Sequence, residues 1–136
     1  MFLLDTNVVS ELRRTKPHGS VLAWLNATPE SELFISAVTL GEIQRGIELT
    51  KEQNPVKALE LAQWADRLAV TQNILPMDGR TFRTWARLMH HKSDALFEDA
   101  MIAATALVHQ LTVVTRNTRD FAAFQVPLLD PFNLLV

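Results

Sequence analysis

Residues 1–7 read Met-Phe-Leu-Leu-Asp-Thr-Asn, and this stretch decides the fold. Phe2 to Leu4 is a short, wholly apolar run, which is typical of a strand buried on both faces of a parallel sheet. Asp5 follows directly, without a turn glycine, so its carboxylate is poorly placed for a surface salt bridge. We therefore expect a buried strand with an acidic side chain at its carboxyl end.

Beyond this strand, short apolar runs alternate with longer segments of helical periodicity, which predicts an α/β domain with a mostly parallel sheet. We expect Ser20, Asn54 and Asp78 to be the N-caps of three helices, with Pro55 in the first helical position of the second. The expected strands are 2–4, 33–36, 74–77, 111–115 and 126–129, the third and the last at sheet edges. The expected helices are 7–13, 20–26, 38–49, 98–109 and two that start near 54 and 78.

Length and composition exclude several classes of protein. The 136 residues, 48% of them apolar, predict a single domain over 1–136. The absence of Cys excludes thiolate metal sites, a Cys nucleophile and disulfides. No apolar run exceeds five residues, so no membrane span is expected. The N-terminus lacks a basic start and carries an early acid, so we expect a cytoplasmic protein without a secretory signal.

The net charge of −2 hides a possible asymmetry. If four of the 15 acidic residues gather at one site, the remaining 11 face 13 Lys and Arg. The surface outside such a site would then carry a net charge of about +2, and binding to a polyanion is compatible with that balance.

Several polar residues fall at strand ends, where ligands bind in open α/β sheets. Asp5 closes the first strand, Glu42 lies about one turn into the helix after the second, and Asp99 lies in the first turn of the alanine-rich helix. Asn117 and Asp120 follow the fourth strand. We expect these side chains to gather at one end of the sheet.

Taken singly, most of these acids have ordinary structural explanations. Glu42 and Arg45 are spaced for an ion pair on a helix surface. Asp99 complements a helix dipole, and Glu98 would do so equally well. Only Asp5 has no such explanation, so the case for a site depends on the acids coming together.

If these carboxylates gather at one site, their electrostatic repulsion must be offset. Two carboxylates about 4 Å apart repel by about 4 kcal/mol at an effective dielectric constant of about 20. A proton or a cation must offset that energy. Ligands that are all oxygen favour Mg²⁺, with Mn²⁺ as a substitute, and Mg²⁺ on such a site commonly meets a substrate phosphate. The chemistry implied is metal-assisted hydrolysis of a phosphodiester.

Four stretches in order along the chain resemble the PIN-domain ribonucleases, and specifically the VapC toxins of bacterial toxin–antitoxin pairs, including the FitB-like branch. These stretches are MFLLDTNVVSE at 1–11, SAVTLGEIQRG at 36–46, EDAMIAATA at 98–106 and VVTRNTRDF at 113–121. The resemblance implies an α/β/α sandwich around a five-stranded, mostly parallel sheet. It covers nearly the whole chain.

The resemblance assigns roles to individual residues. Asp5, Glu42 and Asp99 correspond to the first three acids of the family's metal site. The fourth role goes to Asp120, which leaves Asn117 as a neutral ligand acting through water. Since an amide replaces a carboxylate there, we expect one tightly held Mg²⁺ and a second that arrives with RNA. Thr115 is expected to orient Asp5 through a hydrogen bond.

The resemblance also implies a substrate and partners. The expected substrate is a structured RNA, often a tRNA, cleaved to leave 5′-phosphate and 3′-hydroxyl ends. The expected partners are a second copy of the chain and a VapB antitoxin, whose C-terminal segment lies across the active site. Basic residues that could bind RNA phosphates, or simply form solvated surface, are Arg13, Arg14, Lys16, Arg116 and Arg119.

Other assignments remain open. A phosphatase or a phospho-acceptor also places an aspartate at a strand end, but Asn7 and Arg116 stand where those classes carry Asp and Lys. A non-catalytic binding module with the same fold is the other alternative. His90 and His91 are expected to be structural, because no companion His lies at ligand spacing. The tryptophans at 24, 64 and 85 are expected in the core or a protein interface rather than as base-stacking platforms.

Overall fold

The computed structural model describes residues 1–134, and a single parallel sheet organises them. The strands run in the order β3-β2-β1-β4-β5, and each neighbouring pair is parallel. The strands are β1 (Phe2–Leu4), β2 (Leu33–Ser36), β3 (Asn73–Leu75), β4 (Thr112–Val114) and β5 (Leu128–Leu129). Strand β1, expected to be buried on both faces, lies at the centre of the sheet, and the two predicted edge strands are confirmed.

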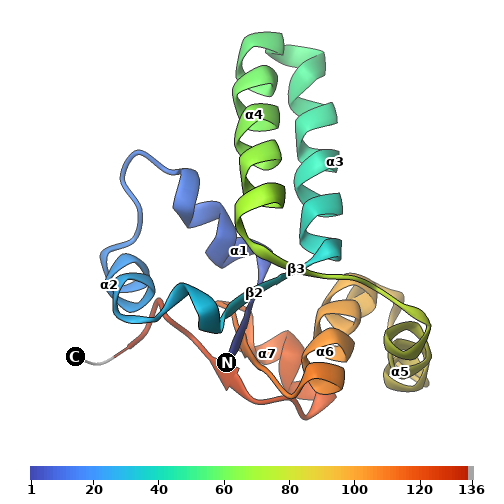
Figure 1. The fold of residues 1–136 in the computed structure, drawn as a ribbon. Helices are drawn as coiled ribbons and strands as arrows, with labels where there is room; N and C mark the ends of the chain where they lie inside the picture. The colour runs from blue at the N-terminus through green and yellow to red at the C-terminus, as the bar shows by residue number, and fades with distance from the viewer. Residues whose placement is uncertain (135–136) are drawn as a thin grey trace.

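Helices cover both faces of this sheet, which confirms the α/β/α sandwich (Figure 1). Helices packed mainly on one face are α1 (Thr6–Val9), α2 (Gly19–Ala27), α3 (Ala37–Gln53) and α4 (Pro55–Thr71). Those on the other face are α5 (Gly79–Met89), α6 (Phe97–His109) and α7 (Thr118–Phe121). Short 3₁₀ turns are η1 (Ser10–Arg13), η2 (Glu30–Glu32), η3 (Asp94–Leu96) and η4 (Ala122–Phe124).

The two cores follow from the alternation of side chains along β1. Leu3 packs with the alanines of α6, including Ala103, in one core cluster. Leu4 packs with Val8 and Val9 of α1 in the other. Because successive residues of a strand point to opposite faces, three apolar residues in a row are sufficient to anchor both layers.

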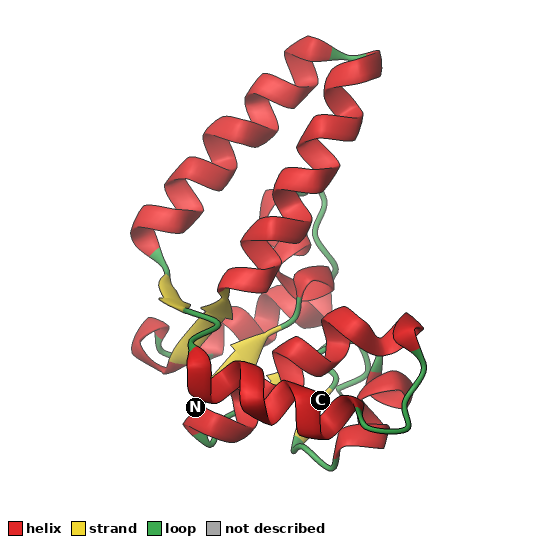
Figure 2. Ribbon diagram, turned by 90° about the vertical axis from the view of Figure 1, so that its right-hand side faces the viewer, coloured by secondary structure: helices red, strands yellow, loops and turns green. Residues whose placement is uncertain are grey.

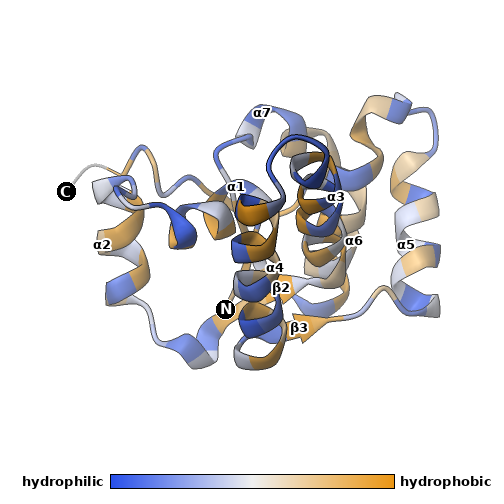
Figure 3. Cartoon of the chain, turned by 90° about the horizontal axis from the view of Figure 1, so that it is seen from above, coloured by the Kyte–Doolittle hydropathy of each residue, from blue (hydrophilic) through white to orange (hydrophobic). Residues whose placement is uncertain are grey.

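Helices α3 and α4 form a long antiparallel pair that projects away from the sheet (Figures 1 and 2). Asn54 separates them and caps α4, since its side chain accepts a hydrogen bond from the Lys57 N–H at 3.1 Å. Pro55 follows in the first helical turn, as predicted. In Figure 3 the turn between the two helices is hydrophilic, whereas strands β2 and β3 are coloured as hydrophobic.

Three details of the predicted elements are wrong. Ser20 is not an N-cap: α2 begins one residue earlier, and the Ser20 hydroxyl donates to the Pro131 carbonyl at 2.7 Å. Helix α3 continues to Gln53 rather than ending at Leu49. The predicted helix at 7–13 is a turn of α-helix followed by the 3₁₀ turn η1. Among residues 1–134, no helix is long and apolar enough to cross a membrane.

The strand order reverses beside β1. The chain leaves β1 toward β2 and β3 and later returns on the other side as β4 and β5. The loops that follow β1 and β4 therefore diverge at the carboxyl edge of the sheet, and such a switch point is where ligands bind in open α/β folds.

Candidate active site

Asp5 lies at this switch point, and its side chain is fixed by three hydrogen bonds. The Thr115 hydroxyl donates to Asp5 Oδ2 at 2.7 Å, and the Asn7 amide donates to the same oxygen at 3.2 Å. The Thr6 backbone N–H donates to Oδ1 at 2.8 Å. Only 4% of Asp5 is exposed. The predicted bond between Thr115 and Asp5 is therefore confirmed.

The same hydrogen bonds tie the β1–α1 segment to the loop after β4. Asn7 Oδ1 accepts from the Arg116 N–H at 3.2 Å, and the Thr115 hydroxyl oxygen accepts from the Asn117 N–H at 2.9 Å. The contacts of Asn7 with Arg116 and Thr115 join residues that are more than one hundred positions apart in the sequence. The two diverging loops thus form one rigid base for the site.

A cleft opens beside Asp5 and brings the predicted acids together. Glu42 of α3 and Asp99 of α6 line it with Asp5, in a volume of about 290 Å³. The remaining lining residues are Thr6, Asn7, Ser10 and Asn117. Helix α6 reaches the cleft because its first turn lies at the carboxyl edge of the sheet, and Glu42 lies one turn beyond the start of α3, as predicted.

Burial and the negative charge of Asp5 raise the pKa of the other two carboxyls of the cleft. Burial and then the charges of Glu98 and Asp5 raise the pKa of Glu42 to about 7, partly offset by a hydrogen bond from Thr6. Burial and the charge of Asp5 raise the pKa of Asp99 to about 6, with Asp120 adding to the effect. Burial raises the pKa of Asp5 as well, against its hydrogen bonds. The negative charges are therefore close enough to repel one another, as expected.

The structure separates the two candidates for the fourth position. Asn117 lines the cleft. Asp120 lies near enough to Asp99 to raise the pKa of that residue, but it is exposed on α7 and does not line the cleft. Asn117 thus contributes an amide group to the cleft, and Asp120 contributes negative charge from outside it.

The donor chemistry of the cleft suits a hard divalent cation, since all its polar side chains offer oxygen or amide groups. Within residues 1–134, however, no three His, Asp or Glu side chains are grouped closely enough to hold an ion directly. Both carboxylate oxygens of Asp5 also accept hydrogen bonds from the protein. The cleft therefore fits an ion that keeps several waters between itself and the protein, which is the usual state of Mg²⁺.

The alternative structural explanation of Glu42 is wrong, because Arg45 pairs with another residue. Arg45 Nη1 of α3 lies 3.1 Å from Glu98 Oε1 of α6, on the rim of the cleft. Glu98 therefore does more than complement a helix dipole: it joins two helices and adds to the negative potential at Glu42. Sequence reasoning missed this pair because the two residues come from different helices.

None of the predicted basic residues lines the cleft itself. Arg14 pairs with the buried Glu11 at 3.1 Å. The Arg116 guanidinium lies 4.0 Å from the centre of the Phe132 ring. Arg119 is exposed on α7 near Asp120, and Lys16 is exposed after η1. The remaining one, Arg13, lines a second cavity next to the cleft.

Three lining residues were absent from the predicted site: Thr6, Asn7 and Ser10. A signal for them exists in the sequence, since they are the polar residues on either side of the apolar Val8 and Val9, directly after Asp5. Thr6 and Ser10 are four positions apart and share one face of the turn. Thr6 also contacts α3, where its hydroxyl lies 3.0 Å from that of Thr39.

Comparison with known families and proteins gives consistent matches. Residues 2–126 match the family described as PIN domain. The chain is 33% identical over 138 residues to Toxin FitB of Neisseria gonorrhoeae, covering 98% of this chain and 99% of that protein. It is 34% identical over 144 residues to the VapC ribonuclease Y4jK of Sinorhizobium fredii, with the same coverage.

The similarity extends to three-dimensional structure. A structure described as FitAB bound to an IR36 DNA fragment superimposes with a TM-score of 0.84 at 34% identity, covering 100% of this chain and 99% of the matched chain. The sequence matches and the structural match therefore point to the same family, and each covers nearly the whole chain.

Proposed function

Since the chain belongs to the PIN-domain family, we propose that it is a metal-dependent endoribonuclease that acts in the cytoplasm as the toxin of a toxin–antitoxin pair. The observation that carries the proposal is the cleft that brings Asp5, Glu42 and Asp99 together, where burial and the charge of Asp5 raise the pKa of the other two carboxyls. A protein gains nothing in stability from such repulsion, so the arrangement points to a cationic ligand. Relatives at about one-third identity are named as a toxin and as a ribonuclease.

The cation we propose is Mg²⁺, with Mn²⁺ as a substitute. Asp5, Glu42 and Asp99 would hold it directly or through water, with Asn117 bound through water and Asp120 adding charge. When bound, such an ion polarises the scissile phosphate and lowers the pKa of an attacking water. With one carboxylate replaced by an amide, we propose one tight site and a second ion that arrives with RNA.

The side chains of the site have distinct tasks. Thr115, Asn7 and the Thr6 N–H hold the Asp5 carboxylate in one orientation. Glu42 has a pKa of about 7 and can accept a proton at a carboxylate oxygen near neutral pH. Arg13 lines the neighbouring cavity, and we propose that it binds phosphates of the RNA backbone together with Arg14, Arg116 and Arg119.

The substrate and partners follow from the resemblance to VapC toxins. We propose a structured RNA, with tRNA as the first class to test, cut to leave 5′-phosphate and 3′-hydroxyl ends. The matched FitAB structure supports a VapB-type antitoxin as partner, and we further propose a homodimer.

A cleavage assay with Asp5→Asn tests the activity. Wild type is expected to cleave RNA in Mg²⁺ or Mn²⁺ and to stop when a chelator is added. Asp5→Asn, which keeps the shape of the side chain, is expected to be inactive. Asp66→Asn, the same change on the exposed face of α4, is the control.

Other outcomes would support the alternatives. Intact RNA with wild type and both variants, under every metal tested, would favour a non-catalytic binding module. Transfer of a phosphoryl group to Asp5 would favour a phosphatase or phospho-acceptor. The burial of Asp5 and its three hydrogen bonds argue against a phosphoryl acceptor, because both oxygens already accept hydrogen bonds from neighbouring groups.

A further inference from the structure

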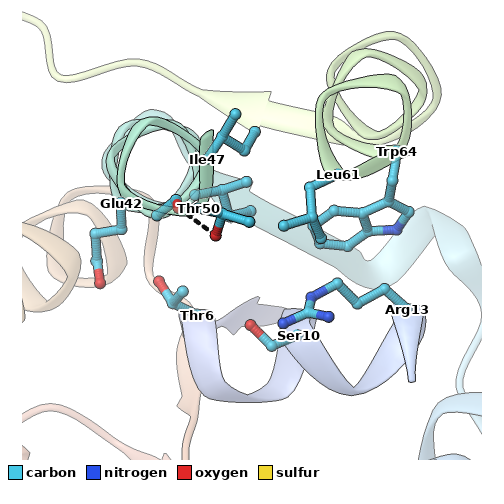
Figure 4. Close-up of a pocket in the computed structure, with 10 residues that line it drawn as sticks. Thr6, Ser10, Arg13, Glu42, Ile47, Thr50, Leu61 and Trp64 are labelled. Carbon is cyan, nitrogen blue, oxygen red and sulfur yellow. Dashed lines mark hydrogen bonds between the residues drawn. The ribbon is translucent and has the colours of Figure 1, made fainter. Parts of the chain in front are cut away.

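A second cavity opens directly beside the acidic cleft, between α1–η1 on one side and the α3–α4 pair on the other (Figure 4). Thr6, Ser10 and Glu42 line both cavities. A chain bound across the cleft can therefore continue into the second cavity without leaving the protein surface.

The walls of this cavity differ in chemistry. Figure 4 shows Arg13 and the hydroxyls of Thr6 and Ser10 on the α1–η1 side, facing Leu61 and Trp64 of α4. One side therefore offers a cation and hydroxyl groups, and the other offers an aromatic ring and aliphatic carbons. The volume is about 200 Å³, which suits one nucleobase and is too small for a base pair.

We propose that this cavity binds one unpaired nucleotide of the RNA substrate, the one next to the scissile phosphate. The inference rests on the proposed ribonuclease function and adds a specificity site to it. Arg13 meets the phosphate of that nucleotide, and the base lies against Leu61 and Trp64. The cation and the continuity with the catalytic carboxylates favour a nucleic acid over a protein segment as the occupant.

Trp64 has a double role in this arrangement. It packs against the core cluster that contains Leu4 and Leu68, as a core residue should. It also remains partly exposed and lines the cavity. Its packing confirms the expected core position, and because aromatic rings commonly stack on bases of single-stranded RNA, its exposed part would meet the base in the proposed complex.

Gly46 gives a way to fill the cavity without disturbing its walls. It lies in α3, lines the cavity, and a Cβ added there meets no atom within 4 Å. Gly46→Leu therefore places four carbons in the cavity while favouring the helix. Gly46→Ala is the control for helix propensity. Gly41→Leu is the matched control for size, since Gly41 lies in the same helix with equally open space but lines a different cavity.

The test combines these variants with RNA lacking single bases. The probes are single-stranded oligoribonucleotides containing a mapped cleavage site, with an abasic residue placed at each position in turn. For wild type, one abasic position beside the cut is expected to raise KM about tenfold, the effect of losing one stacked base. Gly46→Leu is expected to raise KM by the same factor on intact RNA, with kcat nearly unchanged. The abasic change should then have no further effect in that variant, because both changes remove the same contact.

The charge of the cavity is tested separately. Arg13→Gln is expected to weaken RNA binding and to lower its dependence on salt by about one phosphate contact. Arg83→Gln, the same change on α5, is expected to leave both unchanged. An equal effect of the two changes would contradict a specific role for Arg13.

Several results would overturn the inference while leaving the ribonuclease in place. One is a KM of Gly46→Leu equal to that of wild type. Another is a rise in KM of Gly41→Leu as large as that of Gly46→Leu. A third is unchanged RNA cleavage together with weaker binding of an antitoxin, which would make the cavity a protein-binding site. If wild type cleaves neither intact nor abasic RNA in any divalent metal, the proposed ribonuclease function itself is contradicted, and this outcome is distinct from the three above.

Discussion

The hydroxyl of Thr115 has a larger role than its size suggests, because it is the closest partner of a buried carboxylate. It donates to Asp5 at 2.7 Å and also accepts the Asn117 N–H at 2.9 Å. Removing it leaves Asp5 with one donor fewer in a site that is 4% exposed. Such a loss costs about 1–3 kcal/mol.

Thr115→Val removes the hydroxyl but keeps the shape of the side chain, so it tests the hydrogen bond to Asp5. We expect a loss of unfolding free energy in that range, measured by urea denaturation, and a loss of RNA cleavage of about 10- to 100-fold, as is usual for residues that orient metal ligands. Thr105→Val is the control, since the buried Thr105 hydroxyl donates to the carbonyl of Met101 in its own helix. Equal activity of the two variants would show that Thr115 does not position Asp5.

The raised pKa values of Glu42 and Asp99 predict an unusual pH dependence of stability. Their folded values of about 7 and about 6 lie above the ordinary values of 4.5 and 3.8. The folded state therefore binds protons more tightly than the unfolded chain, so this contribution is present at low pH and is lost as pH rises through about 6 and 7. In a chelator, the melting temperature of wild type should fall between pH 5.5 and pH 8.

Glu42→Gln isolates the contribution of one residue. The variant should lose less stability than wild type over that pH interval, because its side chain no longer ionises. Melting curves in matched buffers measure the difference. Identical pH profiles for the two proteins would contradict the raised pKa of Glu42.

At the scale of elements, the Arg45–Glu98 pair connects α3 to α6 at the rim of the cleft. Both side chains are substantially exposed, so the pair itself contributes at most about 1 kcal/mol to stability. Its larger effect is electrostatic, because Arg45 partly neutralises a carboxylate that raises the pKa of Glu42.

Arg45→Met should therefore change stability little and raise the pKa of Glu42 further. We expect the acidic limb of the pH–rate profile for RNA cleavage to move to higher pH. Arg83→Met on α5 should leave the profile in place. A shift in both variants would point to net charge rather than to this pair.

Most elements could be predicted from the sequence because their signals are local. Buried strands are short apolar runs, and Asn54-Pro55 and Asp78 are caps recognisable from the residues beside them. The extension of α3 to Gln53 could not be predicted, since its last turn is polar and shows no apolar period. Ser20 was misplaced because its partner, the Pro131 carbonyl, lies at the other end of the chain.

The candidate site likewise contains residues that local sequence signals predict and residues that they do not. Asp5 was predictable from a carboxylate that ends a buried strand, and the order of four motifs pointed to Glu42 and Asp99. Whether Asn117 or Asp120 stands in the cleft depends on a loop and one short helix, which no spacing rule determines. The functional roles of all these residues stay predictions until variants are assayed, as does the extent of one domain over 1–136.

At the scale of the whole molecule, the repulsion within the cleft predicts stabilisation by divalent cations. Mn²⁺ should raise the melting temperature at pH 7.5. At a concentration one hundred times its dissociation constant, it should add about 2.7 kcal/mol to the free energy of unfolding. Asp99→Asn should reduce the effect, and Asp66→Asn should not. Calorimetric titration should show one tight site without RNA, and two equally tight sites would contradict the weakening attributed to Asn117.

The hydrogen bond that joins Asp5 to Thr115 also has a consequence for synthesis of the chain. A nascent polypeptide that has emerged only as far as α5 carries Asp5 and Glu42 but has neither Asp99 nor the β4 loop that orients the first strand. Most of the polypeptide is thus synthesised before all residues of the cleft are present, and a fragment that ends before α6 cannot form the cleft.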